Sequence, residues 1–355
     1  MKPWLIITGS SGFVGRNLLP FLAKKYEIAA LDLTPNAEVD DHENIRRFKV
    51  DLGDKLAIEE FFKANPRPIA GFINLAAYYS FSNKPSEHYE RLLNGLGTLS
   101  REFCRLKTPT AVFIQASSMA CLEPKPIGQL LDSNSPSHPR WKYPEFKKKS
   151  EDILRKELKV EHYVEFVIAG VYSDFCELVP LYHFLESHRR NNIQRWFFPG
   201  NANRGLTYVH IDDLVEAFGS QLKNTPSHRR LLIGEPAPTT NRQIAEIADI
   251  ELYHFIIPKL IVPAWLAKLG AWLIALIVKK SFYQPWMIDF AEEHYAFDLK
   301  DTTKQLNWIP KNSLKNRLPV MLTNAKNHPE KWKIINKNRP WHDDDWPQLK
   351  HYFTT

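Results

Sequence analysis

Residues 4–15 read WLIITGSSGFVG, a short apolar run followed by three glycines. The aliphatic and β-branched side chains at the start of this stretch predict a buried parallel strand that stops at Gly9. Gly9, Gly12 and Gly15 let the backbone turn tightly and approach a phosphate without a Cβ clash. The helix predicted at 17–25 then offers free N–H groups and the positive end of its dipole. This order of strand, glycine turn and helix predicts a pyrophosphate-binding turn.

An acidic residue lies where dinucleotide-binding proteins contact the adenosine ribose. Asp32 stands at the end of a second predicted strand, residues 27–33, about 20 residues after the glycines. A carboxylate there accepts hydrogen bonds from the ribose hydroxyls and repels a 2′-phosphate, so NAD is favoured over NADP. The other interpretation is a structural glycine turn with a solvent-facing Asp32. On the cofactor interpretation, the turn contacts NAD through Gly9, Ser11, Gly12, Phe13, Val14 and Gly15.

Strands and helices alternate through the first half of the chain. The pattern predicts further strands at 45–50, 69–75, 111–116 and 163–169, and helices at 55–64, 86–106 and 144–158. This order predicts an α/β fold, a doubly wound parallel Rossmann sheet with right-handed crossovers. Ligands bind at the carboxyl ends of the strands in such sheets. The residues at two of these ends are therefore expected NAD contacts: Asp51, Leu52, Leu75, Ala76 and Ala77.

The second half of the chain is richer in helical stretches, loops and prolines. We expect a dinucleotide-binding Rossmann domain at 1–175, to which 206–233 returns. A smaller, mostly helical substrate-binding domain is expected at 176–205 and 234–325, followed by a polar tail at 326–355.

One segment of that second domain, residues 260–278, is strongly apolar and near the length of a membrane span. Pro263, Lys268 and Gly270 interrupt it, so a buried helix or the wall of an apolar pocket is favoured. Trp265 and Trp272 leave a second interpretation open, an adjoining surface patch in peripheral contact with a membrane.

A tyrosine and a lysine lie four residues apart at the start of the helix predicted after the fifth strand. Positions i and i+4 share one face of a helix, so Tyr143 and Lys147 can point into the same cleft. A phenol titrates near ~10, and a nearby ammonium favours its ionised form. Tyr143 can then exchange a proton with a substrate hydroxyl or carbonyl. The alternative is a surface tyrosine and lysine on a basic helix.

The order of these motifs resembles the extended short-chain dehydrogenase/reductase family, which includes NAD-dependent epimerases and dehydratases and hydroxysteroid dehydrogenase-like enzymes. The matching strings include TGSSGFVG, NLAA at 74–77, NGLGT at 94–98, YPEFK at 143–147 and GLTYVHIDDLVEA at 205–217. The resemblance implies an enzyme in which Ser118 hydrogen-bonds the reacting oxygen. It also implies that Lys147 bonds the nicotinamide ribose and that Asn94 holds Lys147 through a water or backbone link.

The resemblance leaves the substrate open. Nucleotide-sugar members often carry an arginine four residues before the histidine of the later element, where this chain has Leu206 before His210. Arg204 is out of register. A hydrophobic alcohol or ketone and a nucleotide sugar both remain open, the second implying an epimerase or dehydratase. A non-catalytic NAD-bound scaffold or sensor is the alternative of another class, because fold does not fix function.

Composition limits the remaining classes. The net charge of +7 is mild and scattered, and no nucleic-acid motif accompanies it, so we expect no nucleic-acid partner and set aside an RNA-binding relative. Three cysteines without paired spacing, and no expected signal peptide, favour a cytoplasmic location, with the inner membrane face as an alternative site of contact.

The resemblance suggests a homodimer through 86–106 and 144–158. We expect no metal, because His210, Asp212 and Asp213 are placed to cap the following helix.

Overall fold

The computed structural model describes residues 2–35, 42–81, 83–226, 229–277 and 285–336. Its centre is a seven-stranded sheet in the order β11-β6-β5-β4-β1-β2-β3, with parallel pairing throughout. The strands of this sheet are β1 (Trp4–Thr8), β2 (Glu27–Asp32), β3 (Ile45–Lys49), β4 (Ile69–Asn74), β5 (Lys107–Ser118), β6 (Tyr163–Ile168) and β11 (Arg230–Ile233). The predicted doubly wound Rossmann sheet is therefore confirmed.

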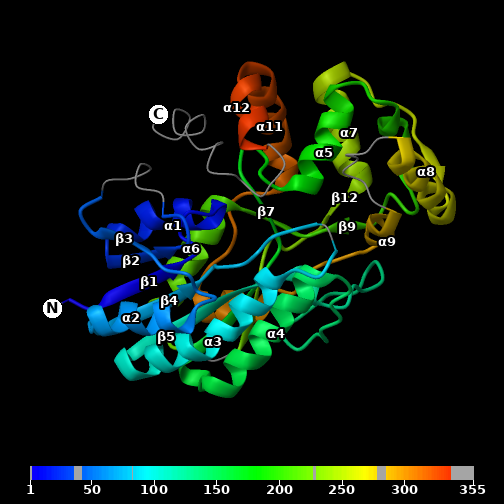
Figure 1. Cartoon of the computed structure of the whole chain (residues 1–355). Helices are drawn as coiled ribbons and strands as arrows, with labels where there is room; N and C mark the ends of the chain where they lie inside the picture. Colours follow the sequence, from blue (N-terminus) through cyan, green and yellow to red (C-terminus); the bar gives the residue numbers. More distant parts are fainter. Residues whose placement is uncertain (1, 36–41, 82, 227–228, 278–284, 337–355) are drawn as a thin grey trace.

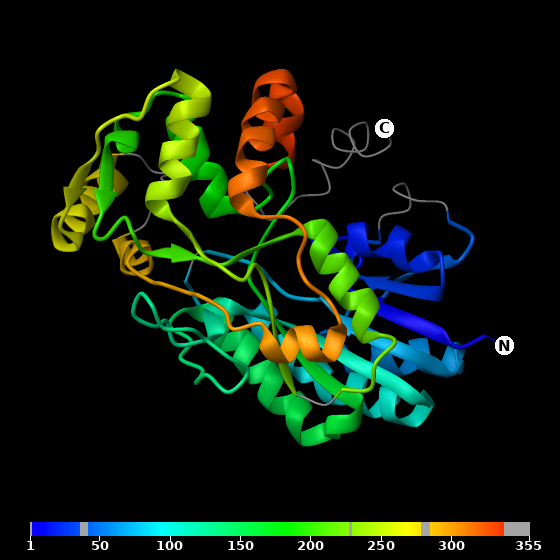
Figure 2. The same cartoon turned by 180° about the vertical axis from the view of Figure 1, so that it is seen from behind.

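Helices cover both faces of the sheet, as Figures 1 and 2 show. Alternate residues of a strand point to opposite faces, so Leu5 and Ile7 pack on one side while Trp4 and Ile6 pack on the other. The first side is covered by α1 (Phe13–Ala23), α6 (Ile211–Gln221) and α10 (Lys300–Leu306). The second side is covered by α2 (Lys55–Ala64), α3 (Glu87–Leu106) and α4 (Lys142–Glu157).

The start of α4 differs by two residues from its predicted position. Trp141 has extended backbone angles, and its carbonyl accepts the first helical hydrogen bond, from the N–H of Glu145 at 3.1 Å. Tyr143 consequently lies inside the first turn of the helix and not before it. Pro144 is compatible with that turn because its nitrogen needs no helical partner there.

The second lobe is mostly helical, as predicted. Its core is made by α5 (Val179–Arg189), α7 (Asn241–Tyr253), α11 (Leu314–Asn327) and α12 (Pro329–Ile335). The first residues of the predicted polar tail include α12, which packs on this core with the ring of Trp332 completely buried. Residues 337–355 lie outside the described residues. The boundaries between the two domains stay a prediction.

Short elements complete the fold. The small strands are β7 (Gly170–Tyr172), β8 (Phe197–Pro199), β9 (Gly205–Leu206), β10 (Tyr208–His210), β12 (Thr239–Thr240) and β13 (Leu260–Val262). The remaining helical turns are η1 (Met119–Cys121), η2 (Val160–His162), η3 (Ile193–Trp196), η4 (Pro285–Met287) and α9 (Ile288–Ala291). After β10 and α6 the chain returns to the main sheet as β11, which pairs with β6.

The apolar segment at 260–278 forms β13 and then α8 (Ala264–Ile277). The prediction of a buried helix or pocket wall is wrong, because the large side chains of β13 and of the first three turns of α8 are exposed. The alternative, an adjoining surface patch, agrees with the structure. Val278 lies outside the described residues. No helix in the described part of the chain is long and apolar enough to cross a membrane.

Candidate functional site

The glycine turn has the geometry that the sequence predicts. Gly9 has a φ of +63°, and a Cβ on Gly15 would lie 2.5 Å from the carbonyl oxygen of Gly9. Gly12 is the N-cap of α1 and carries no side chain that could bond the first N–H groups of the helix. The first N–H groups of α1 therefore have no hydrogen bond to a capping side chain and are left to bond a phosphate.

Asp32 is tied to this turn by hydrogen bonds. The N–H of Ser11 donates to its Oδ2 at 2.9 Å, and the N–H of Thr34 donates to its Oδ1 at 3.2 Å. Burial raises the pKa of Asp32, and the two backbone hydrogen bonds act in the opposite direction. The carboxylate of Asp32 is therefore fixed beside the turn, at the position where the sequence predicts the ribose contact.

A buried polar chain joins the carboxyl ends of three neighbouring strands. The hydroxyl of Thr8 donates to Oδ1 of Asn74 at 2.5 Å, and Nδ2 of Asn74 donates to Oε1 of Gln115 at 2.7 Å. The N–H groups of Leu75 and Ala76 bond Thr8, which holds the segment after β4 against the turn. The predicted contacts Leu75, Ala76 and Ala77 thus lie at the edge of the sheet beside Gly9, whose absent Cβ would touch Ala76.

The residues predicted after the third strand are held differently. Asp51 forms an ion pair with Arg91 of α3 and accepts the N–H of Gly53 at 2.8 Å. Leu52 is buried, and its carbonyl lies so close to α3 that a Cβ on Gly95 would be 1.8 Å away. These contacts give Asp51 and Leu52 a structural role in seating α3 on the sheet, whatever their role toward a cofactor.

Tyr143 and Lys147 lie at the start of α4, and the turn that follows Ser118 packs against this start. The thiol of Cys121, in the turn directly after Ser118, donates to the carbonyl of Pro144 at 3.5 Å. This contact holds the turn against the first turn of α4, which carries the half-buried Tyr143. Nζ of Lys147 lies 5.7 Å from the centre of the Tyr143 ring and donates to the carbonyl of Ala116 at 2.8 Å.

The electrostatics of this pair are dominated by burial. Burial lowers the pKa of Lys147 to about 8, and it raises the pKa of Tyr143 well above the ordinary phenol value. Tyr79 and Cys121 raise the pKa of Tyr143 further. Burial is therefore the dominant effect on Tyr143 in the free protein and favours its neutral form.

The side chain of Asn94 lies exposed on α3, whereas Lys147 is 2% exposed, and the described structure shows no direct hydrogen bond between the two side chains. Nζ of Lys147 donates to the carbonyl of Ala116 on β5. The link from Asn94 to Lys147 through a water or the backbone stays a prediction.

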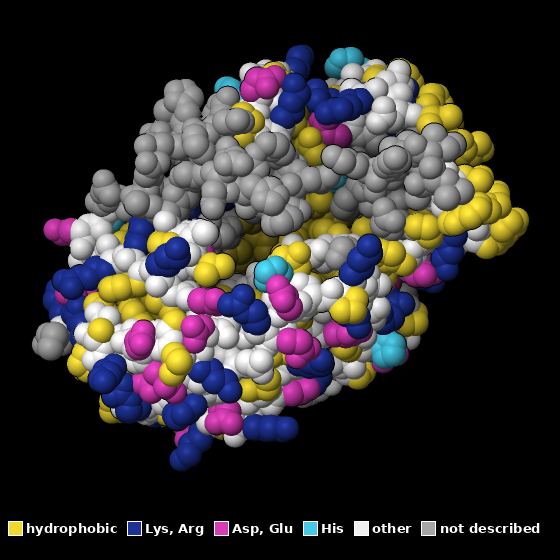
Figure 3. Space-filling model, in the orientation of Figure 1, with side chains coloured by type: hydrophobic (Ala, Val, Ile, Leu, Met, Phe, Trp, Pro, Cys, Tyr) yellow, Lys and Arg dark blue, Asp and Glu magenta, His cyan; other side chains and the backbone are white. Residues whose placement is uncertain are grey.

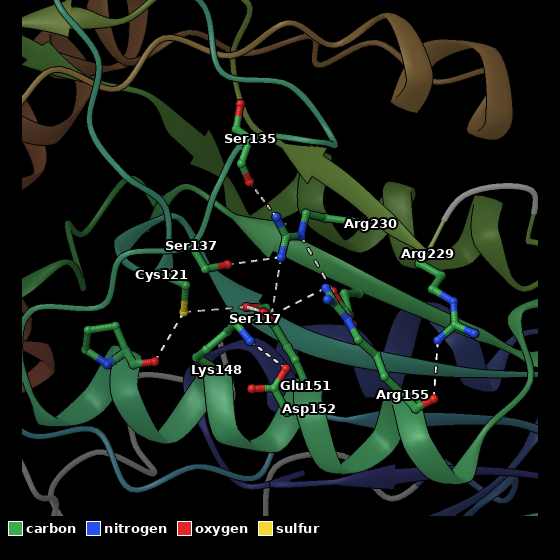
Figure 4. A network of polar contacts seen from close by, with 12 residues as sticks. Ser117, Cys121, Ser135, Ser137, Lys148, Glu151, Asp152, Arg155, Arg229 and Arg230 are labelled. Atoms are coloured by element: carbon green, nitrogen blue, oxygen red, sulfur yellow. Dashed lines mark hydrogen bonds and ion pairs between the residues drawn. The ribbon is translucent and has the colours of Figure 1, made fainter.

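A buried ionic network behind Lys147 was missed by the sequence reasoning. Figure 4 shows Ser117 of β5, Glu151 and Arg155 of α4 and Arg230 of β11 meeting in it. Arg155 also makes two hydrogen bonds to the carboxylate of Glu165, at 2.6 and 2.5 Å. Burial, followed by the neighbouring Glu165, raises the pKa of Glu151 to about 7. The signal was available, since Glu151 follows Lys147 by four residues on the same helix face.

An aromatic cluster in front of Tyr143 was also missed. Its members are Tyr79, Phe81, Trp141, Trp286 and Phe290. Tyr79 meets the Tyr143 ring edge-on with ring centres 4.9 Å apart, and Trp141 lies 5.6 Å from it. The cluster joins three distant parts of the sequence, so no local pattern indicated it. It gives the approach to Tyr143 an apolar wall.

The other charged candidates have structural partners. His210 caps α6 by accepting the N–H of Asp212 at 3.3 Å, as predicted, while Asp213 accepts N–H groups of Lys311 and Asn312. Arg204 donates to the carbonyl of Glu292. In the described ranges no group of three or more His, Cys, Asp or Glu side chains could hold a metal ion.

Comparison with solved structures gives chains of the same fold at low identity. The dTDP-glucose 4,6-dehydratase of Bacillus anthracis, in complex with NAD, has a TM-score of 0.69 and 16% identity, over 93% of this chain and 98% of that one. The UDP-glucose 4-epimerase of Thermotoga maritima, with UDP-glucose, gives 0.66 and 18%, over 92% and 100%. The UDP-glucose 4-epimerase of Thermus thermophilus, with NAD, gives 0.65 and 19%, over 92% and 99%.

A search among curated proteins finds no match to the chain. The model of one family, described as the NAD dependent epimerase/dehydratase family, matches residues 5–234. That range contains the glycine turn, Asp32, Ser118, Tyr143 and Lys147, in the order that the resemblance predicted. With the sheet order, the glycine turn and the family match in agreement, the chain is an enzyme that belongs to the NAD-dependent epimerase/dehydratase family.

Proposed function

We propose that the chain transfers a hydride between NAD and the carbon of a secondary alcohol or ketone. The observation that carries this proposal is the half-buried Tyr143, which stands beside Lys147 and the Ser118 turn at the carboxyl edge of a sheet that also bears the glycine turn. A phenol in this position can give a proton to a carbonyl oxygen, and in the reverse direction its phenolate form can take one from a hydroxyl. NAD, when bound, supplies the hydride acceptor.

Each side chain has a distinct proposed role. Tyr143 moves the proton, and the Ser118 hydroxyl orients the reacting oxygen of the substrate. Lys147, anchored on the Ala116 carbonyl, is directed toward the ribose of NAD and supplies positive charge near the phenol. The turn from Gly9 to Gly15 receives the pyrophosphate, and Asp32 receives the adenosine ribose.

A hydrophobic alcohol or ketone is the substrate class that the surroundings of Tyr143 favour. The aromatic cluster offers apolar contact along the approach to the phenol. Two nearby arginines are already engaged, since Arg140 pairs with Glu293 and Arg204 bonds the Glu292 carbonyl. A diphosphate would require free basic partners, with bidentate arginine the best of them.

A nucleotide sugar is the second candidate substrate. It is supported by the solved structures of like fold, of which one holds UDP-glucose, but these are 16–19% identical and share the fold alone. On that interpretation the chain is an epimerase or dehydratase and uses the same Tyr143 chemistry. The alternative of a non-catalytic scaffold is disfavoured by the complete set of Ser118, Tyr143 and Lys147.

The partners follow from the same proposal. We infer a homodimer in which α3 and α4 of two copies form a four-helix face. We infer a cytoplasmic location with peripheral contact of residues 260–278 at the inner membrane face. Sedimentation analysis tests the dimer, and a purely monomeric chain at working concentration contradicts it.

The proposed activity is tested by NADH formation and thermal shift with two panels of compounds. Sterol-like and polyketide-like alcohols should be oxidised and should raise the melting temperature in the presence of NAD. Trp141→Leu should raise KM for these alcohols, while Leu56→Ala, at an exposed position of α2, should leave KM unchanged. A saturable shift from nucleotide sugars alone would overturn the hydrophobic substrate and favour the epimerase.

A further inference from the structure

The helix α8 presents its large apolar side chains to the outside. The five exposed ones, Trp265, Leu266, Leu269, Trp272 and Leu273, recur at the spacing of a single helix face. The positions between them, where the helix turns toward the protein, hold small residues such as Ala267 and Ala271. A helix of a water-soluble surface has the opposite arrangement, so this face is built to contact an apolar partner.

The apolar face continues beyond the helix. β13 pairs with β8, and Leu260 and Ile261 of β13 and Phe197 of β8 are exposed beside it. Figure 3 shows hydrophobic side chains gathered along the edge of the molecule where α8 lies in Figure 1. We call these three residues and the five of α8 the apolar surface. Isolated exposed hydrophobic residues need no explanation, but a continuous set of this kind does.

The charge of the surrounding sequence is one-sided. Between Glu251 and Asp289 the sequence contains no acidic residue, and it contains the lysines Lys259, Lys268, Lys279 and Lys280. In the structure Lys259 pairs with Asp249 and Lys268 pairs with Asp289. The remaining positive charge is that of Lys279 and Lys280, which follow the apolar segment in sequence, and it is complementary to a bilayer surface that carries anionic headgroups.

The helix α8, as the structure describes it, is too short to cross a bilayer. Its 14 residues span about 21 Å, against about 30 Å for a hydrocarbon core. Tryptophan is suited to the boundary between headgroups and acyl chains, because its ring is apolar and its N–H is polar. Both exposed tryptophans of α8, Trp265 and Trp272, lie on the outward face.

We propose that the apolar surface docks the protein onto an anionic lipid bilayer. A bilayer is favoured over a second copy by the position of the surface relative to Tyr143. α8 packs on η4 and α9, whose Trp286 and Phe290 contact Trp141, and Trp141 contacts Tyr143. An aromatic path thus leads from the docked face to the phenol. The use of this aromatic path rests on the proposed hydrophobic substrate, whereas docking of the apolar surface on a bilayer does not.

Vesicle flotation with the full chain tests the proposal. The protein should float with vesicles of phosphatidylcholine mixed with phosphatidylglycerol, and less with phosphatidylcholine alone. Raising the salt concentration should weaken binding to the mixed vesicles without abolishing it, because salt screens the lysines but not the apolar contact. The double variant Trp265→Glu/Leu269→Glu should partition at least about tenfold more weakly, since two apolar anchors are lost.

A matched control is available on another helix. Leu56 on α2 is 68% exposed, close to the 69% of Trp265, and lies outside the apolar surface. Leu56→Glu should leave flotation unchanged. NAD titration of all variants reports folding and is independent of lipid, so failure of docking and failure of the proposed function are distinguishable. The proposal is overturned if the protein floats with neither kind of vesicle. It is also overturned if the protein does not float and instead forms a dimer that Trp265→Glu/Leu269→Glu dissociates.

Discussion

Gly15→Ala is the substitution whose effect on the cofactor turn the structure predicts most directly. The new Cβ would lie 2.5 Å from the carbonyl oxygen of Gly9 and 2.6 Å from that of Ser10, whereas ordinary contact begins at 3.4 Å. The turn must therefore withdraw by about 0.9 Å from a helix that is packed on the sheet. Overpacking of this kind costs about 1–3 kcal/mol.

This overpacking energy should weaken NAD binding, because the NAD-bound state needs the glycine turn in its native position. Calorimetric titration should show NAD binding weakened by about 5- to 150-fold, which is the same energy expressed as affinity. The control is Gly97→Ala in the middle of α3, where a Cβ meets nothing within 4 Å. That variant should bind NAD normally and gain about 0.5–1 kcal/mol in urea unfolding, because alanine favours the helix. Normal NAD affinity together with normal stability for Gly15→Ala would refute the reasoning.

Three further predictions concern charged residues of the site. Asp32→Asn should keep the acceptor for the Ser11 N–H but lose the charge that repels a 2′-phosphate, so NADP affinity should rise on the order of tenfold relative to NAD in paired titrations. Lys147→Ala should weaken NAD binding and lower kcat together, and a loss confined to kcat would contradict its contact with the ribose. Burial raises the pKa of Glu151 from 4.5 to about 7, so the folded state holds an extra proton between these values and stability falls as pH rises through them. Glu151→Gln should reduce that pH-dependent loss of the free energy of unfolding by roughly 1–3 kcal/mol, measured by urea unfolding. The same pH dependence of stability in the variant would count against the buried network.

The sheet was predictable because its signals are local. A buried parallel strand is a short apolar run that stops at a turn residue, and residues 4–8, 27–33 and 69–75 show that pattern plainly. The boundaries were less predictable. β5 begins at Lys107 and not at residue 111, because Lys107 pairs with Ile69 of β4 before the register shifts.

The parts of the site that were missed depend on contacts between distant segments. The aromatic cluster joins the segment after β4 to the start of α4 and to α9, and no sequence pattern links these regions. Asn94 was assigned by resemblance, but the exposure of its side chain depends on how α3 turns against the sheet. The outward face of α8 was misjudged for a similar reason, because hydrophobicity alone does not say whether an apolar segment is covered by the protein or by something else.

The measurement that tests the central claim most directly is a comparison of Tyr143→Phe with the unchanged chain on the same substrate. The ring still packs against Tyr79 and Trp141 without its hydroxyl, so NAD affinity should be retained within about twofold. NADH formation should fall by about 10²- to 10⁴-fold, the contribution expected of a positioned proton donor. Turnover near that of the unchanged chain would contradict the assignment of Tyr143 as the group that moves the proton.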